Sequence, residues 1–256
     1  GKAACGQIGN IDMLLVSDEE TGSDDSKLIS QQLAEQYDYV LVFEAAGKNN
    51  ELVTGRKGVG TFFIDIKGKA AHAGNHYSEG VNANLEAAHK CIQLTELTDL
   101  ERGTTVNVGK LEGGIGANTI SPHARLIVEM RYTNMKERDR VLEAIHVITH
   151  THEVEGTDAS LSGDIQRDVM EPNEKQQRFL RQLESITGDR LLTEQRGGVS
   201  DANIFAAKGC ITLDGFGPFG DGDHTIHERA NKQSFITRIE QVRKILMHYN
   251  QGLEKD

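Results

Sequence analysis

Cysteine, long apolar runs and positive charge are all scarce in this sequence, and each scarcity excludes a class of protein. The three cysteines, Cys5, Cys91 and Cys210, lie far apart, which argues against a disulfide framework or a four-cysteine zinc site. No apolar run approaches the roughly 20 residues that a membrane-spanning helix needs. Lys and Arg number 28 against 39 Asp and Glu, a formal net charge of -11, so nucleic acid and membrane surfaces are poor partners.

The N-terminal segment GKAACGQIGN also lacks two features. It has no apolar core of a signal peptide, and it has no initiating Met. We therefore expect a chain without signal peptide or transmembrane segment, cytoplasmic or periplasmic, whose natural N-terminus can lie further upstream.

The first 44 residues have the pattern of a strand-helix-strand unit. Apolar runs predict buried strands over Ile11–Val16 and Tyr39–Phe43. The spacing between them predicts a helix over Asp25–Gln36, with Ser23 or Asp24 as its cap. These elements predict an α/β domain.

The following segment predicts a second domain. Its order, strand-helix-strand-strand-helix-strand, is that of a ferredoxin-like α+β layer. We expect the domain limits to be 1–54 and 166–256 for the divided α/β domain and 55–165 for the inserted domain. The inserted strands and helices are expected at Val59–Lys67, Gly80–Leu97, Thr104–Leu111, Ala124–Tyr132, Lys136–His150 and Ala159–Ile165. The second part of the α/β domain is expected to contain helices at Asn173–Thr187, Ala202–Ala207 and Lys232–Leu253 and a strand at Cys210–Leu213.

Carboxylates follow both N-terminal strands. Glu19 and Glu20 come after the first strand and Glu44 after the second, and sites in open α/β sheets gather at that edge. With His224 in the loop GDGDHTIHE (Gly220–Glu228), these oxygen and nitrogen donors suit zinc. A neighbouring carboxylate free of the metal can take a proton from water.

Ordinary structural roles explain each residue equally well when it is taken alone. Glutamate doublets are common at exposed helix starts, where they complement the helix dipole. A strand-end glutamate such as Glu44 is usually a surface residue, and His224 and His227 could lie in a solvated turn. Asp201 in VSDA is expected to be a helix cap. The same segment has no nucleophile-elbow glycines, which disfavours a serine hydrolase using Ser200.

Six motifs in order resemble the co-catalytic zinc metallopeptidases that include carboxypeptidase G, aminoacylase and acetylornithine deacetylase. Among these, the glutamate carboxypeptidase branch is the most similar. The resemblance implies a partial zinc-peptidase α/β catalytic domain with an inserted ferredoxin-like α+β dimerisation (lid) domain. It covers the chain from Ile11 to its end through SDEETGS (17–23), YVLVFEAA (39–46), IKGKAAHAG (66–74), GANTISPHARLIVEMRY (116–132), RGGVSDA (196–202) and GDGDHTIHERAN (220–231).

The resemblance also implies a role for individual residues of the catalytic centre. Glu19 corresponds to the general base that activates water. Glu20 and His224 correspond to ligands of one zinc ion, and Glu44 to a ligand of a second. His72 corresponds to a lid histidine that, in a homodimer, stabilises the oxyanion in the partner's site.

Four further residues correspond to substrate-binding positions. Asn118 and Arg131 match lid residues that hold a substrate carboxylate, for which a planar guanidinium is suited. The backbone of Gly197 and Gly198 is expected to line the pocket. An alternative for Arg131 is a sheet-surface ion pair with Glu129.

The chain departs from the family upstream of the glutamate doublet. Members carry a His-x-Asp motif and a bridging aspartate there, whereas the 16 residues before Ser17 contain no histidine. Two protein ligands remain for the zinc of Glu20 and His224, and one for the zinc of Glu44, whereas catalytic zinc takes about three. We expect weak zinc binding, if any, and an exposed sheet edge beside Ile11–Val16.

These observations favour two functions. The first is a zinc-dependent amidohydrolase of the carboxypeptidase G type, incomplete or truncated, that cleaves a small peptide or N-acyl amino acid beside a free carboxylate. The second is a non-catalytic dimerisation or carboxylate-binding module on the same scaffold. A truncated product, one piece of a larger protein and a retired enzyme all remain open.

Overall fold

The computed structural model describes residues 10–251, which divide into two compact units. The split unit comprises residues up to Arg56 and from Met170 onwards, and the inserted unit comprises Lys57–Val169. The limits expected at residues 55 and 165 lie close to these. Cys5, nearly all of the segment GKAACGQIGN and the end of the helix expected to reach Leu253 lie outside the described residues. Within residues 10–251, no helix is long and apolar enough to cross a membrane.

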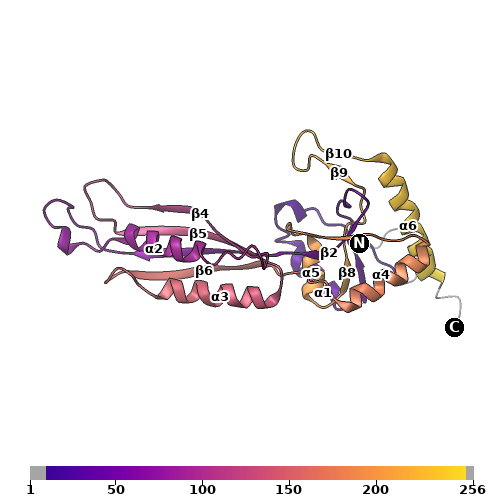
Figure 1. Cartoon of the computed structure of the whole chain (residues 1–256), viewed down its shortest axis with the longest axis horizontal. Helices are drawn as coiled ribbons and strands as arrows, with labels where there is room; N and C mark the ends of the chain where they lie inside the picture. Colours follow the sequence, from indigo (N-terminus) through magenta and orange to yellow (C-terminus); the bar gives the residue numbers. More distant parts are fainter. Residues whose placement is uncertain (1–9, 252–256) are drawn as a thin grey trace. The chain divides into compact units, whose positions relative to one another are not determined.

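The inserted unit has the predicted ferredoxin-like topology (Figure 1). Its four antiparallel strands lie in the order β4-β5-β3-β6, and α2 packs on β4 and β5 while α3 packs on β6 and β5. Each helix begins at an asparagine whose side chain accepts backbone N–H groups, Asn82 for α2 and Asn134 for α3. The elements are β3 (Gly58–Lys67), η2 (Tyr77–Glu79), α2 (Ala83–Thr95), β4 (Thr105–Gly113), β5 (His123–Tyr132), α3 (Met135–His150) and β6 (Asp158–Arg167).

The core of this unit follows from strand alternation. Phe62, Ile64 and Ile66 of β3 are buried, whereas the residues between them are only partly buried. Leu126 of β5 lies opposite Ile64 and Val128 opposite Phe62, so both strands bury the same face. This face forms one apolar core with the buried residues of α2 and α3.

The split unit has shorter strands in three two-stranded sheets. The pairs β1-β8 and β2-β7 are parallel, and β9-β10 is an antiparallel hairpin. A separate apolar core lies between β2, β8, α4 and α6. The elements are η1 (Glu19–Thr21), α1 (Ser26–Ala34), β1 (Tyr39–Leu41), β2 (Leu52–Arg56), α4 (Glu174–Thr187), β7 (Thr193–Arg196), α5 (Asp201–Ala207), β8 (Ile211–Leu213), β9 (Gly220–Asp221), β10 (Arg229–Ala230) and α6 (Lys232–Gln251).

Three expectations for the N-terminal part of the split unit were wrong. Ile11–Val16 forms no strand, because no described strand pairs with it, and Leu15 is 83% exposed. The second strand is shorter than Tyr39–Phe43, and Phe43 is 58% exposed instead of buried. Neither Ser23 nor Asp24 caps α1, since the Asp18 carboxylate accepts the backbone N–H groups of Asp25 and Ser26, both at 3.0 Å.

A buried ion pair connects the strands of the split unit. Arg56 Nε lies 2.6 Å from Asp214 Oδ2, and both side chains are almost fully buried. Arg56 also donates to the carbonyl of Gly198 at 3.0 Å, and Ser200 Oγ donates to the same Asp214 oxygen at 2.7 Å. The backbone of Arg56 exchanges two hydrogen bonds with Met170, where the chain returns from the inserted unit. One side chain thus holds together β2, the residue after β8 and the start of α5.

We predict that Arg56→Met destabilises the protein by about 3–5 kcal/mol, because the Asp214 carboxylate is then buried without its counter-ion. Chemical denaturation of the variant measures this loss. The double variant Arg56→Met/Asp214→Asn is expected to recover part of it, since no buried charge is left unpaired. Equal stability of the single variant and the wild type would contradict the prediction.

Candidate active site

The parallel pair β1-β8 brings Glu44 and Asp214 to one edge. Asp214 follows β8 directly and Glu44 lies three residues after the end of β1, and the carboxyl ends of parallel strands meet at the same edge of a sheet. The backbone carbonyl of Glu44 accepts the N–H of Gly217 at 2.8 Å. A Cβ at Gly217 would lie 2.7 Å from that oxygen, so only glycine permits this approach.

Glu44 lies among other carboxylates. Burial, followed by the negative charges of Asp214, Glu19 and Glu20, raises the pKa of Glu44 to about 7. The Arg56 guanidinium acts in the opposite direction and lowers this pKa, but it does not outweigh them. Glu19 and Glu20 are thus near enough to Glu44 for their charges to affect its pKa.

The glutamate doublet sits on a short helical turn, η1, and not at the end of a strand. Its loop is fixed by the hydroxyl of Ser23, which donates to Asp201 Oδ1 at 2.7 Å. Glu20 Oε2 lies 3.7 Å from His224 Nδ1, and both side chains are exposed. The structure thus brings together two residues that the resemblance assigned to one zinc ion.

His224 is presented by the loop between β9 and β10. Arg229 and Asp221, paired at 2.6 Å, close the base of this hairpin. His224 adopts the left-handed region, with φ of 61°, which a non-glycine residue enters at some energetic cost. The loop conformation therefore sets the direction of the imidazole toward Glu20.

The expectation that Asp201 caps the helix of the VSDA segment was wrong. Ser200, and not Asp201, caps α5, because Ser200 Oγ accepts the N–H of Ala202 at 3.1 Å. Asp201 is the first residue of the helix and accepts the bond from Ser23. Ser200 is buried and its hydroxyl is bonded to Asp214, so it is not available as a nucleophile.

Gly197 and Gly198, which were expected to line the pocket, lie next to this buried network. The Gly198 carbonyl is held by Arg56, and Gly197 precedes it in the turn between β7 and α5. The sequence analysis overlooked Asp214 and Arg56, the residues that hold this turn. The position of Asp214 directly after an apolar strand is the same signal that identified Glu44.

The donors suit zinc by type but not by number. Zinc accepts carboxylate and imidazole ligands, and a catalytic ion takes about three from protein. In the part of the chain that the structure describes, no group of three or more His, Cys, Asp or Glu residues is arranged to hold a metal ion. Glu20 and His224 form a pair, and Glu44 adds negative charge without completing a set. These residues therefore do not form a zinc site by themselves.

In the inserted unit, His72 and Asn118 lie on adjacent backbone segments. The N–H of Ala73 donates to the Asn118 carbonyl at 2.9 Å, and His72 forms a bridge with Thr119. His72 Nδ1 accepts the N–H groups of Gly74 and Asn75, both at 3.2 Å. A neutral imidazole with Nδ1 as acceptor carries its proton on Nε2, so His72 presents a donor there.

Arg131 is not brought to the same place. It lies at the far end of β5, opposite Val59, whereas the loop that carries Asn118 enters β5 at His123. Arg131 lies eight positions along β5 from His123, about 27 Å at the usual rise per residue. Arg131 pairs with Glu129 at 2.9 Å, the ion pair that was the alternative for it. One carboxylate cannot contact both Asn118 and Arg131 of a single chain.

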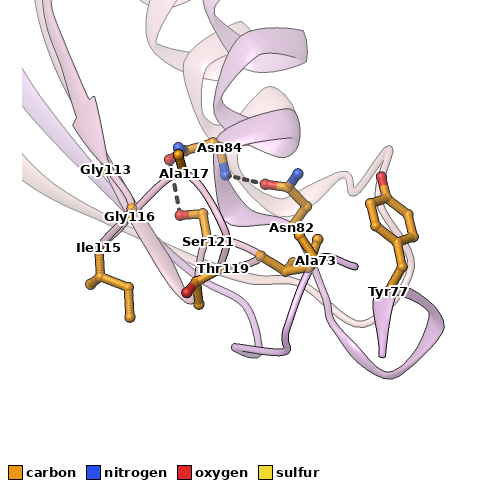
Figure 2. A pocket seen from close by; sticks show the side chains of 12 residues that line it. Ala73, Tyr77, Asn82, Asn84, Gly113, Ile115, Gly116, Ala117, Thr119 and Ser121 are labelled. Atoms are coloured by element: carbon orange, nitrogen blue, oxygen red, sulfur yellow. Dashed lines mark hydrogen bonds between the residues drawn. The ribbon is translucent and has the colours of Figure 1, made fainter. Parts of the chain in front are cut away.

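A cavity of about 680 Å³ adjoins the His72 and Asn118 segments (Figure 2). Ala73 and Thr119, their immediate neighbours, line it. On another side, Ser121 Oγ donates to Asn84 Oδ1 at 3.0 Å and fixes that amide against the Gly113–Gly114 turn. The lining is largely polar side chains and glycine backbone.

Comparison with known proteins identifies relatives of both units. Residues 54–157 match the peptidase dimerisation domain of the M20 family. The chain is 28% identical over 250 residues to carboxypeptidase G2 of a Pseudomonas strain, covering 95% of this chain and 60% of that protein. It is 32% identical over 157 residues to a probable carboxypeptidase of Aspergillus fumigatus, covering 54% of this chain and 35% of that protein.

Solved structures show the same fold. An aminopeptidase PepT from Bacillus cereus superimposes with a TM-score of 0.74 at 23% identity, covering 89% of this chain and 62% of that one. A tripeptidase from Staphylococcus aureus gives the same TM-score at 22% identity, covering 91% and 62%. The chain spans about three fifths of the length of the first of these relatives. The domain match and the carboxypeptidase G2 likeness support a relationship between this chain and the M20 peptidases, and the solved structures share its fold.

Proposed function

We propose that this chain supplies the carboxylate cluster of a hydrolase that cleaves an amide beside a free carboxylate, in a small peptide or an N-acyl amino acid. The observation that carries the proposal is that Glu44 lies near enough to Asp214, Glu19 and Glu20 for their charges to raise its pKa. Such an accumulation of acidic groups is costly for folding and is typical of functional sites. The relatives named as carboxypeptidases support the same reaction class.

Within this site Glu19 is the proposed general base. A carboxylate at hydrogen-bonding distance from a water molecule can take its proton as the water attacks the amide carbonyl, and can then return the proton to the leaving amine. Peptidases of this family are generally metal-dependent. The described residues do not complete a zinc site, however, so no step is assigned to zinc.

The proposed role of His72 rests on its hydrogen bonds. Because Nδ1 accepts two backbone N–H groups, the protonated Nε2 is free to donate to an oxyanion. In the proposed homodimer this donor serves the partner's site. Asn118 lies beside His72, so it is the better candidate for the same substrate, whereas Arg131 is held by Glu129 at the other end of β5.

A non-catalytic dimerisation or carboxylate-binding module is the second candidate. Two observations favour it: the match of residues 54–157 to a dimerisation domain and the lack of a three-donor metal group among residues 10–251. The homodimer is common to both candidates. Turnover is what separates them.

The inserted unit offers a surface for the homodimer. Leu85 and Ile92 lie seven residues apart on α2 and are 47% and 61% exposed, so they share one face of the helix. Leu111 of the edge strand β4 pairs with the buried Leu126 and therefore lies on the sheet face that carries the helices. The Leu111 side chain is nevertheless exposed. We define Leu85, Ile92 and Leu111 as the α2-β4 patch. An apolar patch beside an open sheet edge favours association with a second chain.

We predict that Glu19→Gln lowers hydrolysis of an N-acyl amino acid by about 10²–10⁴-fold, because the amide cannot take a proton from water. Hydrolysis is measured on the 256-residue chain with and without added zinc, together with zinc bound per chain after dialysis. Glu35→Gln, at an exposed position of α1's C-terminus, is the matched control and should retain activity. Folded wild-type dimer without turnover in either condition would instead support the second candidate.

We predict that Glu44→Gln stabilises the metal-free protein above pH 7. The folded pKa of Glu44, about 7, exceeds its ordinary value of 4.5, so the native state binds more protons than the unfolded state between these values. Wild-type stability therefore falls as pH rises through this window, and the amide removes that loss. Denaturant unfolding at pH 5 and pH 8 tests this: the gain should be larger at the higher pH. With the exposed Glu240→Gln as control, a gain independent of pH would refute the assigned cause.

We predict that Ile92→Lys shifts the protein from dimer to monomer, because a charge in the centre of the α2-β4 patch would be buried without a partner. Light scattering after size-exclusion chromatography measures the mass at several concentrations. Val147→Lys, at a similarly exposed position of α3, is the control. A dimer that survives Ile92→Lys but not Val147→Lys would place the interface on α3.

A further inference from the structure

Two exposed histidines lie one turn apart at the end of α3. His146 and His150 have ring centroids 4.3 Å apart and planes inclined by 33°. Val141, Ile145 and Thr149 of the same helix are buried. The imidazole pair therefore lies on the opposite, solvent-facing side of the helix.

The hydrogen bonding of His150 leaves one nitrogen available. Its Nδ1 lies 2.8 Å from the backbone carbonyl of His146. A carbonyl oxygen only accepts, so Nδ1 carries the proton and Nε2 keeps its lone pair. Donation of the other ring N–H to a carbonyl is the usual arrangement of a metal-binding histidine, because it fixes the tautomer and the ring orientation.

The helix end that carries the pair is held rigidly. Lys90 Nζ is buried and donates to the carbonyls of Ile148 and Thr151, each at 2.6 Å. Glu86 lies 2.8 Å from the same Nζ and offsets its charge. A ligand pair on such an anchored helix loses little conformational entropy on binding.

We propose that His146 and His150 form a two-nitrogen binding site for a divalent transition metal ion, with preference for Cu²⁺ over Ni²⁺ and Zn²⁺. Imidazole donors four residues apart on a helix meet on one face, and the order of affinities follows the general series for nitrogen ligands. His152 is not a third ligand, since its Nδ1 is 3.4 Å from Thr157 Oγ1 and faces Glu86. Water completes the coordination of the ion.

The test is a titration of the purified 256-residue chain with Cu²⁺ alone, followed by electron paramagnetic resonance. We expect coordination by two imidazole nitrogens in the wild type. His146→Ala and His150→Ala should each leave a one-nitrogen signal and weaken binding on the order of a hundredfold, because the second contact is no longer intramolecular. Circular dichroism of each variant, and of the conservative His146→Gln, establishes that α3 is still folded.

Two controls separate this site from others. His89→Ala removes an exposed histidine of α2 whose neighbours four residues away are Leu85 and Gln93, and it should leave the signal unchanged. His224→Ala removes the histidine beside Glu20 and should also leave it unchanged. Wild-type affinity and signal in both α3 variants, or loss of the signal only in His224→Ala, would overturn the proposal. Neither result depends on whether the chain hydrolyses amides.

Discussion

The buried contact between Arg56 and Asp214 is the constraint on which the split unit depends. Asp214 follows β8 and lies beside Glu44, so its charge raises the pKa of Glu44. Without Arg56 the cluster would contain a further unpaired carboxylate in a poorly solvated position, which is among the most costly arrangements in a folded protein. The Arg56 guanidinium also donates a hydrogen bond to the Gly198 carbonyl. It therefore both compensates the charge of Asp214 and positions the adjacent turn. Stability and the candidate site therefore share one residue.

The acidic cluster shows what a site can contain without being complete. The charges of three other carboxylates raise the pKa of Glu44, and Glu20 and His224 lie close together, yet residues 10–251 contain no three-donor group. The buried part of the arrangement is firmly held by Arg56, Ser200 and the Gly217 turn. The exposed part depends on the β9-β10 loop and on η1, which present His224 and Glu20 from two separate segments. The crowding of negative charge around Glu44 and the approach of Glu20 to His224 thus favour binding of a cation. The number of donors does not complete a site for one.

How much the sequence could predict differs between the units for physical reasons. In the inserted unit β3 and β5 alternate, and α2 and α3 each begin at an asparagine cap, so local pattern and tertiary structure agree. In the split unit β7, TEQR, contains no apolar residue and pairs only with β2 from a distant part of the chain, so no local signal marked it. Ile11–Val16 has the composition of a strand, but composition cannot supply a pairing partner. Glu20 and His224, which the resemblance assigned together, lie 3.7 Å apart, whereas the Arg56–Asp214 contact joins residues 158 apart and was visible only in the structure.

The placement of Asn118 and Arg131 separates two ways of assigning a substrate site. Both residues occur in one sequence motif, which suggests a shared ligand, but β5 is extended and its two ends are far apart. Residues several positions apart along an extended strand therefore lie far apart in space, even when they are close in the sequence. Asn118 shares its end with His72, whose Nε2 proton is set by backbone N–H groups, while Arg131 shares the other end with Glu129. In a chain that dimerises through this unit, the two ends of β5 can serve different sites. Strand geometry therefore determines which residues can bind the same substrate, even when one motif contains them both.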